Sequence, residues 1–98
     1  MKVHELKIKP PNFQAILDGR KSFEIRRNDR NYKEGDILIF RENKNGGKNG
    51  YTGRSMRCVL TYVASAYPVL AEGYVVMSID VYSWQTSEFS ECLESVKK

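Results

Sequence analysis

Long apolar runs and spaced metal ligands are the two features that this sequence most clearly lacks. No run of about 18 apolar residues occurs and the N-terminus has no hydrophobic signal-peptide stretch, so we expect no membrane span and a cytoplasmic location. His4 is the single histidine, and the two cysteines, Cys58 and Cys92, do not have the spacing of a metal or redox site. Nucleophile elbows, paired-carboxylate patterns and zinc signatures are also absent. The sequence therefore predicts neither a metal nor a cofactor.

Size and charge indicate one small domain with a basic half. The chain has 98 residues, near the commonest domain size, and a formal net charge of +4. Residues 1–57 carry 14 Lys and Arg against seven Asp and Glu, whereas residues 58–98 carry two against five. A concentration of positive charge favours phosphate-bearing partners, but it also serves solubility alone. Composition leaves both interpretations open.

Residue patterns predict several strands and one early helix. Residues 4–9 alternate as a first strand, and Pro10-Pro11 begins a helix that ends at Gly19. The remaining predicted strands cover 22–28, 37–40, 56–63 and 74–82. The polar run 43–50 is predicted to be a mobile hairpin tip. Residues 37–40 are continuously apolar, so we expect them to be buried on both faces.

These elements predict an α+β, mainly β fold, namely a small barrel-like sheet, a β-barrel or pseudo-barrel, of five to six strands with an N-terminal helix after the first strand. Closure into a barrel would remove exposed strand edges. We place this domain at 1–84 and a C-terminal amphipathic helix at 85–98. The apolar stripe of that tail is formed by Phe89, Cys92, Leu93 and Val96. The stripe either packs on the barrel, which leaves a monomer, or forms a weak homodimer contact.

Some single residues carry predictions of burial. His4 is expected to be a hydrogen-bonded histidine in the interior or at its rim, and Cys58 a small core residue. Tyr62 and Tyr74 fall within predicted strands, where a core position is favoured over a stacking role. Two further aromatic residues lie beside loops, namely Tyr51 and Trp84. For these two, the sequence does not decide between packing in the core and stacking on a base.

The segment 19–26 carries the chemistry. Its strand places Phe23 and Ile25 on one face and Ser22, Glu24 and Arg26 on the other, with Lys21 at the corner. A guanidinium suits a phosphate or a base edge, whereas a lysine is a compact charge. The carboxylate between these cations can orient both or accept a bond from an exocyclic amine. The alternative is a surface salt-bridge ladder of little energetic value.

The pattern Gly19-x-Lys21-x-x-Glu24-x-Arg26 matches the G-x-K-x-x-E-x-R signature, so the chain resembles the ASCH domain of the PUA-like superfamily. Five further segments resemble its DUF3850 subfamily of bacterial and phage proteins, and they are His4 to Ile8, Phe23 to Arg30, Gly35 to Leu38, Tyr51 to Arg54 and Glu72 to Val76. The resemblance covers about residue 3 to residue 81. It implies a PUA-like β-barrel with a cleft beside the motif that binds RNA or a nucleotide-like ligand.

A ligand site built on this motif includes charged, amide and aromatic side chains. Its predicted members are Lys21, Glu24, Arg26, Lys7, Glu5, Arg27, Asn28, Arg30 and Tyr51. Other cations that could follow a phosphate backbone are Lys33, Arg41, Lys44, Lys48, Arg54 and Arg57.

A non-catalytic binding domain is the leading hypothesis, and two alternatives stay open. Some small ASCH relatives are amidohydrolases of N4-acylated cytidine, and this chain has Glu24 where their catalytic threonine is expected. In a hydrolase with rearranged roles, Lys21 would be the base and Glu24 or Ser22 would assist it. The other alternative is a protein-interaction module that uses the 43–50 tip or the tail.

Overall fold

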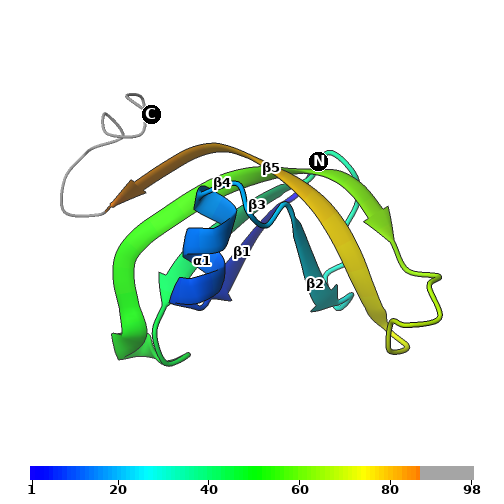
Figure 1. Cartoon of the computed structure of the whole chain (residues 1–98), viewed down its shortest axis with the longest axis horizontal. Coiled ribbons are helices and arrows are strands. Elements are labelled where there is room, and N and C mark those ends of the chain that lie inside the picture. Colours follow the sequence, from blue (N-terminus) through cyan, green and yellow to red (C-terminus); the bar gives the residue numbers. More distant parts are fainter. Residues whose placement is uncertain (87–98) are drawn as a thin grey trace.

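The computed structural model describes residues 1–86 and shows a curled five-stranded sheet with one α-helix (Figure 1). The elements in chain order are β1 (Val3–Ile8), α1 (Pro10–Leu17), β2 (Phe23–Arg27), β3 (Ile37–Asn43), the short 3₁₀ turn η1 (Lys48–Gly50), β4 (Tyr51–Ala64) and β5 (Tyr74–Thr86). No helix in this part of the chain is long and apolar enough to cross a membrane. Of the predicted tail helix, 85–86 belong to β5 instead, and the rest lies outside the described residues.

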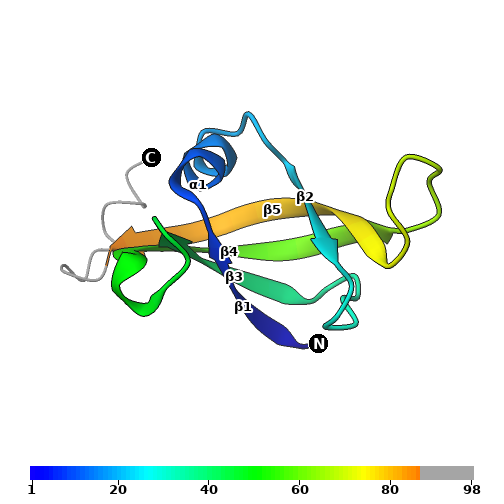
Figure 2. The same ribbon diagram turned by 90° about the horizontal axis from the view of Figure 1, so that it is seen from below.

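The sheet is half a barrel. Its strand order is β1-β3-β4-β5-β2, with β1 parallel to β3 and the other neighbours antiparallel. Figure 2 looks into the concave side, where α1 and β2 lie in front of the long strands. The predicted barrel-like curl is confirmed, but the barrel is not closed, because β1 and β2 are the two edges of the sheet and share no ladder. The helix α1 contributes two apolar side chains, Phe13 and Ile16, to the core that the sheet encloses.

The core lies on the concave side of the arch. Alternate residues of neighbouring strands form rows there, such as Leu6, Phe40 and Met56. Residues 37–40 are not buried on both faces as predicted, since Ile37 and Ile39 are only half-buried. The reason is that helix and core cover a single face of this sheet. The core position predicted for one cysteine is confirmed, and burial raises the pKa of the Cys58 thiol to about 12.

The two strand tyrosines are not core residues, contrary to the prediction. Tyr62 is 55% exposed and Tyr74 is half-buried. A shift of register between Leu60 and Tyr62 interrupts the alternation of β4, which places Tyr62 on the convex face. Trp84, which the sequence left open, is partly buried against the core.

The hairpin tip at 43–50 has its own framework of hydrogen bonds. Asn43 is buried, and its Oδ1 accepts bonds from the backbone N–H groups of Asn45 and Gly46 at 3.0 and 2.5 Å. Its Nδ2 donates to the Gly47 carbonyl at 2.9 Å. Gly50 packs so closely against this turn that a Cβ atom would lie 2.3 Å from the Asn43 Oδ1. The hairpin is therefore confirmed, with an asparagine as its organiser.

A buried hydrogen bond between a histidine and a carboxylate fixes the start of β1 to the turn before β3. His4 Nε2 lies 2.8 Å from Asp36 Oδ2, and the edge of the Tyr32 ring packs on the imidazole. The backbone N–H groups of Lys2 and Lys33 donate to the same carboxylate at 2.9 and 3.1 Å. Burial by itself would raise the pKa of Asp36, but the bonds from His4 and the two backbone groups lower it to about 2. The interior hydrogen-bonded histidine predicted from the sequence is confirmed.

We expect Asp36→Asn to lower the free energy of unfolding by about 2 kcal/mol at pH 7. The folded-state pKa of about 2 lies below the ordinary aspartate pKa of 3.8, so this stabilisation is present above pH 3.8 and disappears as the pH falls through 2. Urea unfolding of both proteins at several pH values measures it. The exposed Asp29→Asn is the matched control, and a wild-type advantage that stays constant down to pH 2 would contradict the assignment.

Candidate functional site

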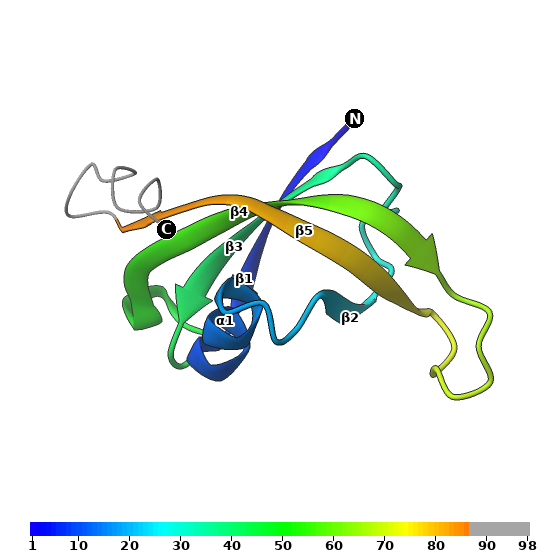
Figure 3. The ribbon, with the colours of Figure 1, turned by 45° about the horizontal axis from the view of Figure 1, so that its top comes forward.

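Strand β2 turns its charged face inward. Glu24 is 6% exposed, whereas Phe23 and Ile25 are 44% and 48% exposed. The alternation predicted for this strand is confirmed, but the buried face is the charged one. Since β2 is an edge strand on the concave side, its inner face meets the core and the opposite edge of the sheet (Figure 3).

The Glu24 carboxylate lies between two cations. Lys21 Nζ donates to its Oε1 at 3.1 Å, and Arg26 Nε donates to its Oε2 at 2.7 Å. The lysine also donates to the Asn12 side chain of α1 at 3.1 Å. The side chains of Lys21 and Arg26 are only 18% and 26% exposed, so this is not the exposed salt-bridge ladder considered above. Both carboxylate oxygens are engaged, and Glu24 thus orients the two cations.

Arginine side chains bridge the opening of the half-barrel. Arg26 Nη2 donates to the Lys7 carbonyl at 2.6 Å, and Arg30 Nη1 donates to the Glu5 carbonyl at 3.2 Å. Both carbonyls belong to β1, the opposite edge strand. Hydrogen bonds from ionised donors are stronger than those between neutral groups, so these contacts substitute for the missing backbone ladder.

A cavity of about 250 Å³, here called the edge cavity, opens beside this bridge. Its lining residues are Glu5, Leu6, Lys7, Arg26, Arg30, Arg41 and Tyr51. Five of the predicted ligand residues are thus brought together, and Arg41 joins them from the wider set of cations. Arg41 is on β3, which brings it to the cavity through the parallel pairing of Lys7 with Arg41. No local sequence signal predicts that pairing.

The other predicted site residues do not line the edge cavity. Glu24 holds Arg26 through one carboxylate oxygen, and Lys21 donates to the other oxygen. Arg27 points to the opposite face of β2, where its guanidinium lies 5.4 Å from the centre of the Tyr74 ring. Asn28 organises the following turn, since its Oδ1 accepts a bond from the Tyr32 N–H at 3.1 Å.

The groups that a hydrolase would need are not arranged as a nucleophile and its base. The Lys21 ammonium is held by Glu24 and Asn12. Ser22 is exposed, and within residues 1–86 its hydroxyl has no hydrogen bond to the lysine. The same part of the chain contains no group of three His, Cys, Asp or Glu residues that could hold a metal ion.

A second buried carboxylate, Glu42, has a structural role. Arg54 donates to both of its oxygens at 3.0 and 2.9 Å, and Thr52 Oγ1 donates at 2.6 Å. The same guanidinium reaches Gln14 of α1 at 3.1 Å and covers the Phe13 ring. Burial acts to raise the pKa of Glu42, but the bonds from Arg54 and Thr52 lower it overall. Arg54 therefore ties α1 to the hairpin.

Comparison with known proteins identifies the family. The model of a domain of unknown function, DUF3850, matches residues 3–79. A protein of Escherichia phage P2, described as an uncharacterized 12.9 kDa protein in the GpA 3′ region, is 38% identical over 76 residues, which cover 78% of this chain and 66% of that protein. The crystal structure of hypothetical protein PH0355 superimposes with a TM-score of 0.54 at 21% identity, over 84% of this chain and all of the other, and shares the fold. Because the family match spans most of its length, the chain belongs to the DUF3850 family.

Proposed function

We propose that this chain is an ASCH-type, PUA-like domain that binds RNA or a nucleotide-like ligand in the edge cavity. The observation that carries the proposal is the composition of the cavity wall. Four of its seven lining residues are cations, against one acid, Glu5. Such a wall attracts phosphate groups.

Arg26 is the main phosphate-binding group in this proposal. Its guanidinium is fixed by Glu24 on one side and by the Lys7 carbonyl on the other. A guanidinium has five N–H donors, and these two bonds leave Nη1 without a hydrogen bond among the described residues. A cation held in place loses little conformational entropy when a ligand binds, so the buried carboxylate raises affinity without touching the ligand.

Recognition of a base would fall to Tyr51 and Glu5. Both line the edge cavity, and the Arg41 guanidinium lies 4.0 Å from the centre of the Tyr51 ring. An aromatic ring braced by a guanidinium is a suitable surface for base stacking. The Glu5 carboxylate can accept a hydrogen bond from the exocyclic amine of cytosine or adenine.

We expect Arg26→Gln to weaken binding of a fluorescein-labelled single-stranded RNA by about tenfold, since it removes a fixed charge from the cavity. Fluorescence anisotropy at two salt concentrations measures the affinity. Arg27→Gln is the matched control, because it removes the same charge from the opposite face of the same strand.

Arg30→Gln is a second cavity variant that separates loss of binding from loss of folding, because Arg30 is exposed and makes a single hydrogen bond to β1. It should weaken binding with little change in thermal unfolding. Wild-type affinity in both cavity variants, or an equal loss in Arg27→Gln, would contradict the proposed site.

We further expect no deacetylation when the protein is incubated with N4-acetylcytidine, because no activated nucleophile faces Lys21. Mass spectrometry of the nucleoside measures the reaction. Ser22→Ala is the matched variant, and it should bind RNA with wild-type affinity. A product that forms with the wild type and disappears in Lys21→Ala would show an enzyme instead.

A further inference from the structure

A second hollow adjoins the edge cavity on the convex face of the sheet. Its volume is about 570 Å³, and we call it the outer hollow. It shares three lining residues with the edge cavity, which are Glu5, Arg41 and Tyr51. The two spaces therefore adjoin the same three residues, and the second lies within reach of an extended ligand that leaves the first.

The outer hollow arises from short side chains between long ones. The ladders place Lys7, Arg41 and Ser55 in one cross-strand row and Glu5, Ile39 and Arg57 in the next. Gly53 and Ser55 fill little space between these long side chains. Lys7 Nζ also donates to the Gly46 carbonyl at 2.6 Å, which holds the hairpin tip close to β1.

Two half-buried arginines of this hollow have no carboxylate partner. Arg41 and Arg57 form no ion pair with any residue of 1–86, and the guanidinium of Arg41 lies over the Tyr51 ring. They are diagonal neighbours across β3 and β4, because Arg41 pairs with Ser55 and Ile39 pairs with Arg57. Arg54 also lines the hollow, but its guanidinium is engaged by Glu42. Glu5 is the one acid among the lining residues of the hollow, and two adjacent cations that no carboxylate pairs with favour an anionic ligand.

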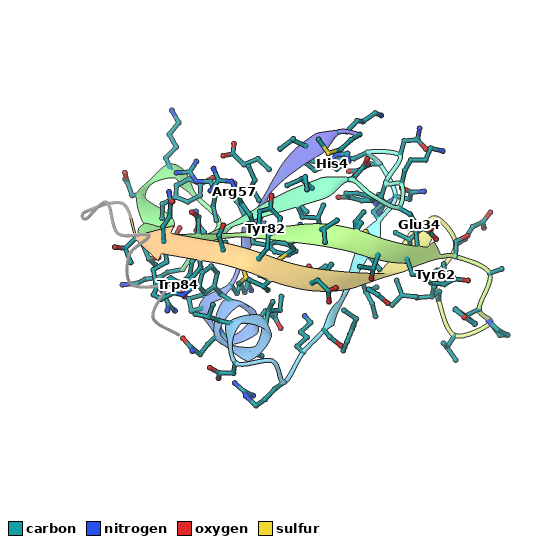
Figure 4. All side chains as sticks on the ribbon, turned by 90° about the horizontal axis from the view of Figure 1, so that it is seen from above. His4, Glu34, Arg57, Tyr62, Tyr82 and Trp84 are labelled. Carbon is teal, nitrogen blue, oxygen red and sulfur yellow. The ribbon has the colours of Figure 1, made fainter. Side chains whose placement is uncertain are left out.

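An exposed tyrosine continues this row. β4 pairs Arg57 with Ser83 and then Cys58 with Val81, so Tyr82 is an extra residue in a bulge beside Arg57. Its side chain is 56% exposed. Figure 4 views the arch from above and shows Tyr82 next to Arg57. The convex face thus presents two arginines between two aromatic rings, Tyr51 and Tyr82.

We infer that the outer hollow binds the continuation of a single-stranded nucleic acid whose first nucleotide occupies the edge cavity. This inference rests on the proposed function and makes its ligand an oligonucleotide with several phosphates. Two cations flanked by aromatic rings fit an unpaired strand, because phosphates follow the cations and unstacked bases find aromatic faces. A duplex keeps its bases stacked and offers the tyrosines nothing to stack on.

The test compares fluorescein-labelled RNA trimers and decamers. We expect Arg57→Gln to weaken decamer binding about fivefold to tenfold and to reduce the slope of log K against log salt by about 0.7. Trimer binding should not change, because Arg57 lines only the outer hollow. Arg57→Lys should retain most of the decamer affinity, and Arg27→Gln is the control for loss of one charge elsewhere.

Three outcomes would overturn the inference. If Arg57→Gln binds the decamer like the wild type while Arg26→Gln still loses affinity, the outer hollow is not used but the proposed function stands. If the wild type binds neither oligonucleotide, both fail. A duplex of the same length that binds as tightly as the single strand would exclude the single-strand assignment.

Discussion

The buried Glu24 carboxylate is the constraint on which the rest of this structure depends. Taking an ion out of water costs several kcal/mol, and only partners of opposite charge with good geometry offset that cost. Here Lys21 and Arg26 approach the carboxylate from both sides, at 3.1 and 2.7 Å. Because Glu24 fixes Arg26, the guanidinium reaches the Lys7 carbonyl across the opening. The carboxylate therefore sets both the position of β2 and the geometry of the edge cavity.

An incomplete barrel is a requirement of this arrangement. If β1 and β2 shared a ladder, the Lys7 and Glu5 carbonyls would accept backbone N–H groups and the arginines would have no anchor. The opening leaves these carbonyls free for Arg26 and Arg30 and leaves room for a cavity of about 250 Å³ between the edges. Exposed strand edges usually invite pairing with another chain, and covering them with charged side chains prevents it.

Local patterns in the sequence predicted the strands and the helix well, but they predicted less well which faces of the strands are buried and which strands are neighbours. Alternation in residues 4–9 and 22–28 gave two strands, and Pro10-Pro11 gave the helix start, because these signals depend on neighbouring residues alone. The inward turn of Glu24 depends on which side of β2 faces the core, and alternation does not encode that. The pairing of Lys7 with Arg41 joins residues far apart in the chain, so the outer hollow was not predictable either. Bulges account for the misplaced Tyr62, since one extra residue reverses the faces of everything that follows.

The distribution of partners among the arginines says more about function than the net charge does. Two arginines each hold a buried acid, as Arg26 holds Glu24 and Arg54 holds Glu42. Glu42 neutralises Arg54, whereas Glu24 is shared between Lys21 and Arg26 and leaves one net positive charge beside the edge cavity. Arg41 and Arg57, on the convex face, have no such acid. A half-buried cation without an acid is less well solvated than a free one and gains more from an incoming anion. The two arginines without a paired acid therefore point to the outer hollow more specifically than the abundance of cations in the chain does.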